Sequence, residues 1–283
     1  MLVKIKLNYD IIFIHNERRN KLIDFTKARN SFEEYLNDYD RESGMVKLKI
    51  AHTYGVVRLS EYIATELNLS DCDIELAKLI GLLHDIARFE QIKEFGDFRD
   101  YKSLDHADLG VRILFEDGLI RKFIDTDEFD HIISAAIKNH NKLEIEDGLD
   151  ELELLHAKII RDADKADNFR VKTFDPIEDI FSGTKEELEN SVITDKIYND
   201  FMSSKTIINY ERVTLADEWI SYLALLFGFY FTPGLKYIKE HDFVNKIIDR
   251  VDYKNSDIKL KMEKIRKHTL KYLDNLLSIN STN

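Results

Sequence analysis

The sequence predicts an all-α fold, and two observations support this prediction. Only two prolines and ten glycines occur among 283 residues, which are few turn-forming residues for a β protein with many turns. Apolar residues instead recur three and four positions apart over long stretches, as on a helix with one buried face. Hydrophobic residues make up 44% of the chain and charged residues 33%, so the chain can fold around a substantial core.

The first three predicted helices follow from capping and periodicity. A helix should begin near Ser31, because Ser31-Phe32-Glu33-Glu34 has the spacing of a capping box. A second helix spans about residues 46–67, and His52 lies on its apolar stripe. A third runs from Asp71 to Phe89 and is apolar around much of its circumference, with His84-Asp85 near its end.

Three more predicted helices each carry a polar residue on an apolar face. Ser103 is the expected N-cap of a helix whose inner face includes His106. The next helix covers residues 128–140 and ends in a histidine that shares the face of its apolar residues. After an acidic loop, a helix from about residue 152 to 168 places Asp164 on its apolar side.

The rest of the chain predicts short helices joined by irregular connections over residues 175–210, followed by longer, aromatic-rich helices. We therefore expect an N-terminal segment over 1–30, a domain over 31–175, and a helical extension over 176–283 that packs on it to form one compact unit. The sequence leaves open whether the extension covers a cleft or forms a homodimer contact.

Composition excludes several classes of protein. The net charge of −12 argues against general nucleic-acid binding, although a local basic pocket stays open. One cysteine, Cys72, excludes an internal disulfide and a Cys-rich zinc site, and it fits a reducing compartment. No apolar run approaches the roughly 18 residues of a membrane span, so we expect a cytoplasmic protein without membrane contact.

Six residues have the types and order of a metal cluster, and each lies in a predicted helix: His52, His84, Asp85, His106, His140 and Asp164. Imidazole and carboxylate together suit Mn, Fe, Co, Ni or Zn, and Mg remains an alternative. Four histidines and two aspartates exceed the ligands of one ion once substrate and water bind, which predicts two ions bridged by Asp85. Periodicity alone does not choose Asp164 over its neighbours Asp162 and Asp167.

These residues resemble the HD-domain superfamily of metal-dependent phosphohydrolases. His52, the His84-Asp85 doublet and Asp164 match the superfamily pattern, and His106 and His140 resemble two extra histidines that convert a one-metal site into a two-metal site. The string from His84 to Gln91 is similar to a bacterial subgroup that often has Gly where this chain has Ala87. The resemblance covers about residues 46–168.

The resemblance implies a helical bundle with a metal centre, selects Asp164 as the ligand, and implies hydrolysis of a phosphate ester. The expected substrate is a small phosphorylated molecule such as a nucleotide, attacked by a metal-activated hydroxide. Asp85 would act in catalysis as the bridging ligand. Arg88 and Lys165 are candidates to hold the phosphate, with structural ion pairs as the alternative for both.

Two other functions stay open at this stage. Some relatives with a six-ligand set of this type use oxygen, so a mixed-valence di-iron oxygenase is one alternative. A metal-containing protein that senses nucleotides or regulates another protein is the second. Native metal content and product release would separate these alternatives from a phosphohydrolase.

Overall fold

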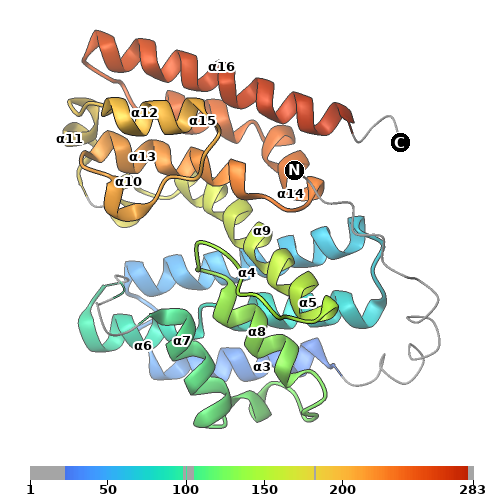
Figure 1. Ribbon diagram of the computed structural model, residues 1–283. Coiled ribbons are helices and arrows are strands. Elements are labelled where there is room, and N and C mark those ends of the chain that lie inside the picture. Colours follow the sequence, from blue (N-terminus) through green and yellow to red (C-terminus); the bar gives the residue numbers. More distant parts are fainter. Residues whose placement is uncertain (1–22, 98–99, 101–104, 182, 280–283) are drawn as a thin grey trace. The chain divides into compact units, whose positions relative to one another are not determined.

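The computed structural model describes residues 23–97, 100, 105–181 and 183–279, and all regular structure in these ranges is helical (Figure 1). The predicted all-α fold is confirmed. None of the helices in the described part of the chain combines the length and apolar character needed to cross a bilayer.

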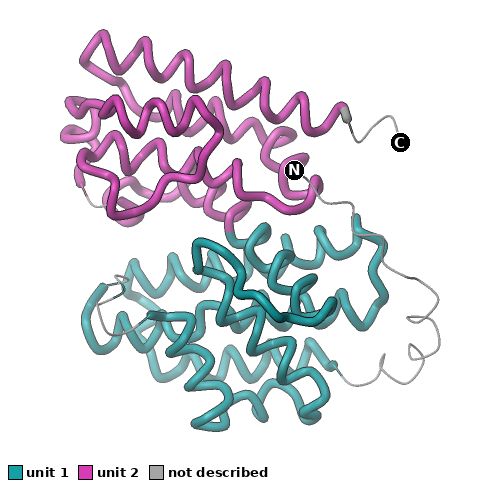
Figure 2. The backbone as a smooth tube through the Cα atoms, viewed as in Figure 1, with its two compact units in different colours: residues 1–164 teal, residues 165–283 magenta. Residues whose placement is uncertain are grey.

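The chain divides into two compact units, Met1–Asp164 and Lys165–Asn283 (Figure 2). The division falls inside helix α9, which spans Glu151–Phe174. The sequence placed the domain boundary at residue 175 instead. Of the predicted N-terminal segment 1–30, residues 1–22 lie outside the described part of the chain.

Unit 1 is built from helices that surround a core of branched apolar side chains. Its elements before α9 are α3 (Phe25–Tyr35), η1 (Leu36–Asp38), α4 (Gly44–Glu66), α5 (Asp71–Leu83), α6 (Ile86–Phe95), α7 (His106–Val111), the π-helical η2 (Arg112–Glu116), η3 (Leu119–Lys122) and α8 (Asp130–Asn139). Helices α4 and α5 form the most extensive helix pair. Gly81 of α5 allows this close approach, because a Cβ there would lie 3.2 Å from the Val57 Cα of α4.

The first helix begins earlier than predicted. Asp24 caps α3, and its side chain accepts a hydrogen bond of 3.0 Å from the Lys27 amide. Ser31 lies inside the helix, where its hydroxyl donates to the Lys122 carbonyl oxygen at 2.7 Å. The Ser-x-x-Glu pattern was therefore not a start signal, because a hydroxyl inside a helix can bond to a neighbouring element instead of a helix terminus.

The predicted single helix from Asp71 to Phe89 is two helices. Helix α5 ends at Leu83 and α6 begins at Ile86, so His84 and Asp85 lie at the junction. Asp85 has φ −107° and ψ 19°, outside the helical region, and this turns the chain between the two helices. His84 and Asp85 therefore lie at the turn between α5 and α6 rather than within either helix.

The predicted cap at Ser103 lies outside the described residues. In the structure Asp105 caps α7, because its carboxylate accepts hydrogen bonds from the amides of Ala107 at 2.8 Å and Asp108 at 3.3 Å. His106 is the first residue of this helix. The cap therefore fixes the backbone directly before a candidate ligand.

Unit 2 contains the rest of α9 and a set of shorter and longer helices, as the sequence predicted for this region. They are α10 (Ile177–Ile180), α11 (Lys185–Glu189), α12 (Asp195–Met202), η4 (Asn209–Glu211), α13 (Leu215–Ala224), η5 (Leu225–Gly228), α14 (Thr232–Glu240), α15 (Phe243–Asp249) and α16 (Ser256–Ile279). Trp219 is fully buried and meets Phe181 edge to face at 5.5 Å between ring centroids. Aromatic packing thus forms much of this core.

Candidate metal centre

The His84 imidazole is fully buried and directed by its own helix. Its Nδ1 lies 2.8 Å from the carbonyl oxygen of Gly81. Because a carbonyl oxygen only accepts, Nδ1 carries the proton and the lone pair of the neutral ring lies on Nε2. Burial lowers the pKa of His84 to about 4, which keeps the ring neutral near pH 7. Nε2 makes no hydrogen bond and lies 3.6 Å from Asp85 Oδ2.

One group of candidate ligands gathers around His84 from three separate elements. His52 of α4 places its Nε2 3.1 Å from Asp164 Oδ1 and 3.9 Å from Asp85 Oδ2. The ligand atoms of His52, His84 and Asp85 all lie within 4.8 Å of one another. Burial alone would raise the pKa of the Asp164 carboxyl. The hydrogen bond and charge of His52 lower this pKa by more than burial raises it, so the net pKa lies well below the usual range.

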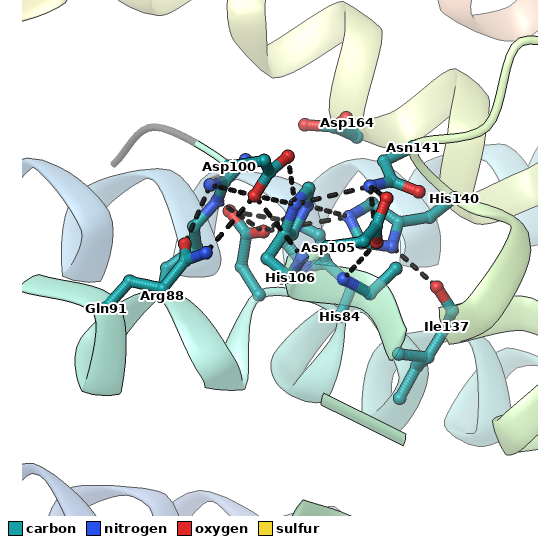
Figure 3. Close-up of polar contacts among 12 residues, drawn as sticks. His84, Arg88, Gln91, Asp100, Asp105, His106, Ile137, His140, Asn141 and Asp164 are labelled. Carbon is teal, nitrogen blue, oxygen red and sulfur yellow. Dashed lines mark hydrogen bonds and ion pairs between the residues drawn. The ribbon is translucent and has the colours of Figure 1, made fainter. Parts of the chain in front are cut away.

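A second group shares Asp85 with the first. The Nε2 atoms of His106 and His140 lie 3.4 and 3.7 Å from Asp85 Oδ1, and they lie 2.9 Å from each other. Figure 3 shows both rings near His84. Asp85 therefore presents Oδ2 to the first group and Oδ1 to the second, which is the arrangement expected of a bridging carboxylate.

The close contact between the Nε2 atoms of His106 and His140 indicates whether a cation fits between them. His140 Nδ1 lies 2.7 Å from the Ile137 carbonyl, and His106 Nδ1 lies 3.0 Å from both oxygens of Asp100. Both Nδ1 atoms therefore donate, and neutral rings would bring two Nε2 lone pairs together. A divalent ion with metal–nitrogen bonds of about 2.0–2.1 Å accepts two nitrogens roughly 3 Å apart. The residues thus fit a divalent metal.

All six predicted ligands come together in unit 1, and the structure adds a cation that the sequence prediction missed. Lys49 Nζ donates to Asp85 Oδ2 at 2.7 Å, and its side chain is 15% exposed. Burial raises the pKa of Asp85, but the Lys49 charge and the nearby imidazoles outweigh it, so the net pKa is well below the ordinary value. Lys49 precedes His52 by three residues on α4, and this helical spacing was the available signal.

The two predicted phosphate contacts have different surroundings. Arg88 lies one turn into α6, with Nε 3.7 Å from Asp85 Oδ1 and Nη1 2.9 Å from Asp100 Oδ1. Lys165 belongs to unit 2, where its ammonium donates to the Gly228 carbonyl oxygen and lies 5.3 Å from the Tyr230 ring centroid. These contacts place Arg88 beside Asp85.

A further group of possible ligands lies on the surface of unit 1. His131 Nε2 lies 3.8 Å from Asp150 Oδ2, and Glu153 completes the group. Asp150 Oδ1 also accepts hydrogen bonds from the amides of Leu152 and Glu153 at the start of α9. These carboxylates therefore have a capping role that explains their position without a metal.

The comparison with known families agrees with this geometry. A family model described as the HD domain matches residues 50–168, a range that includes all six predicted ligands. The chain contains an HD domain. The predicted family is confirmed, and HD domains are metal-dependent hydrolase domains that bind divalent ions. No curated protein and no solved structure matches the chain.

Proposed function

We propose that this HD domain hydrolyses the phosphate ester of a small molecule, such as a nucleotide, with two divalent ions. The observation that supports the proposal most is the position of Asp85, whose two oxygens each face a separate group of imidazoles. His52, His84, Asp85 and Asp164 would hold one ion, and Asp85, His106 and His140 the other. Bound divalent ions would lower the pKa of water and polarise a phosphoryl oxygen.

The protein's own cations would orient the substrate. Lys49 and Arg88 both lie beside Asp85 and are mostly buried, so their charges act with little screening by solvent. A phosphate that approaches Asp85 would receive hydrogen bonds from the Lys49 ammonium and the Arg88 guanidinium, which offset its negative charge. Lys165 stays a predicted phosphate contact on the basis of the sequence.

The substrate is proposed to be small for two reasons. The net charge of −12 repels an extended polyanion, so a nucleic-acid backbone is a poor ligand. The six ligand side chains are also largely buried, with His84 at 0% and Asp164 at 23% side-chain exposure. A single phosphate group suits such a centre better than a polymer.

The test begins with the metal content of the protein as purified, followed by a panel of nucleoside mono-, di- and triphosphates, cyclic dinucleotides and generic phosphodiesters. Release of phosphate or alcohol with Mn, Co or Ni would support the proposal. Two irons with substrate-dependent oxygen uptake would instead show a di-iron oxygenase. A ligand-induced thermal shift without turnover would show a sensor.

Variants connect activity to the centre. His84→Gln and His52→Gln each remove one imidazole of the first group, whereas His241→Gln replaces an exposed histidine in unit 2 whose Nδ1 lies 2.9 Å from its own helix's Tyr237 carbonyl. The first two should lose metal and activity, and the third should keep both. If the first two variants retain full metal content and full rate, the proposed function is wrong.

A further inference from the structure

Asp100 is surrounded by hydrogen-bond donors from both α6 and α7. Its Oδ1 accepts from Arg88 Nη1 at 2.9 Å, from Gln91 Nε2 at 3.2 Å and from the His106 backbone amide at 3.3 Å. The His106 Nδ1 lies 3.0 Å from each of its two oxygens (Figure 3). Such a carboxylate is ionised, and its pKa lies well below the usual range because these donors outweigh burial, which alone would raise it.

The contact with His106 sets the state of that ring. A carboxylate accepts from Nδ1, so the neutral ring carries its lone pair on Nε2, the atom that faces Asp85 and His140. The paired oxygens also restrict rotation of the ring about its side-chain torsions. Carboxylates in this position raise the basicity of a ligand histidine and fix its orientation.

Arg88 and Gln91 hold Asp100 in turn. Arg88 Nη1 donates to Gln91 Oε1 at 2.8 Å while both side chains donate to Asp100, which forms a closed triangle of hydrogen bonds. Gln91 is fully buried, and the Arg88 side chain is 14% exposed. Ordered donors therefore fix the carboxylate before any ligand arrives. A guanidinium has five N–H donors, so Arg88 can hold Asp100 and also contact a phosphate.

We propose that Asp100 is a positioning residue for the ion held by His106, His140 and Asp85, and that Gln91 and Arg88 hold it in place. The inference rests on the proposed two-ion centre. Asp100 acts through His106, which belongs to only one of the two ligand groups, so loss of Asp100 should weaken binding of one ion and leave the other bound. This selectivity separates a positioning role from a general contribution to folding.

The experiment titrates the full chain with Mn²⁺ after chelation and compares Asp100→Asn with the wild type. In the variant we expect the affinity for one of two ions to fall by about 10–100-fold, the usual effect of losing such a partner. The electron paramagnetic resonance signal of a coupled Mn pair should vanish at concentrations that saturate the remaining site. Asp100→Glu should restore part of the affinity.

The matched control is Asp108→Asn, the same chemical change on α7 at an exposed residue that pairs with Lys142 at 3.1 Å. It should leave both affinities unchanged. Gln91→Leu, which removes one hydrogen-bond donor to Asp100, should weaken binding of the same ion to a smaller degree. Unchanged affinity for both ions in Asp100→Asn relative to the wild type would overturn the proposal, as would equal weakening of both, or a wild type that binds fewer than two.

Failure of the proposed hydrolase function can be distinguished from failure of the Asp100 proposal. A wild-type chain that binds two Mn²⁺ ions but hydrolyses no phosphate ester would contradict the hydrolase proposal. The selective effect of Asp100→Asn on Mn²⁺ binding would still be measured in that case, because neither the titration nor the resonance signal depends on turnover.

Discussion

Two sets of buried polar groups, one in each unit, meet opposite kinds of partner. In unit 2 the buried Asp217 accepts hydrogen bonds from the amides of Thr194 at 2.8 Å and Thr214 at 3.2 Å, and the buried Lys172 donates to the Ile180 carbonyl. Each of these charges is satisfied by nearby backbone. The metal centre of unit 1 instead directs imidazole nitrogens with lone pairs toward one another and toward the carboxylate of Asp85.

The partners of a buried charge distinguish a structural role from a ligand site. A buried carboxylate with several N–H donors stabilises the backbone that supplies them. Acceptors that face one another cost free energy unless a cation lies between them. Asp217 therefore indicates structure, whereas Asp85 and the rings of His84, His106 and His140 indicate a ligand.

The largest effect that tests the comparison comes from Asp85→Asn against Asp217→Asn. Asp85→Asn should lose both ions and reduce hydrolysis by more than the roughly 10–100-fold cost of losing an outer partner. Asp217→Asn should keep both ions but lower the free energy of unfolding by about 1–3 kcal/mol, because amides in unit 2 lose a charged acceptor. Metal per chain, hydrolysis rate and urea unfolding measure this, and metal loss in both variants would contradict it.

Removal of metal should affect the two units unequally. An ion at 100 times its dissociation constant stabilises the state that binds it by about 2.7 kcal/mol. Hydrogen exchange should therefore accelerate in α4, α5 and α8 after chelation, while α13 and α16 keep their protection. The comparison fails if exchange accelerates equally in both units, or in neither.

Two glycine variants give a smaller effect. Gly81→Ala places a Cβ 3.0 Å from Ser60 Oγ and 3.2 Å from Val57 Cα, so α4 and α5 must separate. We expect a cost of about 1–3 kcal/mol, offset in part by about 1 kcal/mol of helix propensity, and weaker metal binding because His84 bonds to the Gly81 carbonyl.

Gly228→Ala is the counterpart in unit 2. Its Cβ would approach Lys165 Nζ at 3.3 Å, the end of a flexible side chain that can move. This variant should lie closer to the wild type in both urea midpoint and metal affinity. A larger loss of stability from Gly228→Ala than from Gly81→Ala would show that the helix contact in unit 1 is less rigid than its geometry indicates.

The smallest expected effect concerns a histidine in unit 2. Burial lowers the pKa of His268, and its Nε2 lies 2.9 Å from Ser204 Oγ. The unfolded chain therefore takes up the proton first as pH falls below about 6.5, so this residue reduces stability at acidic pH. His268→Gln should flatten the loss of stability between pH 7 and 5 without changing metal content. Urea midpoints at both values test this, and an unchanged slope would contradict it.

The sequence predicted much of the architecture because periodicity records which face of a helix is buried. Val56 and Ile63 on α4 and Ile133 and Ile137 on α8 repeat at helical intervals, and their helices agree closely with the prediction. The predicted start of α3 was wrong, since the Ser31 hydroxyl bonds to the carbonyl oxygen of Lys122, a residue 91 positions away. A pattern of neighbouring residues cannot predict a hydrogen bond to a residue so far away in the chain.

Local patterns in the chain were enough to predict the all-α fold, the HD family and the six side chains that the structure gathers, because helical spacing and residue order are local properties of the chain. The packed structure was needed to find the turn at His84-Asp85 and the contacts of Lys49 and Asp100 with the centre. Lys49 reaches Asp85 from another helix, 36 positions earlier in the chain. Asp100 meets donors of both α6 and α7. Such contacts exist only after the helices have packed.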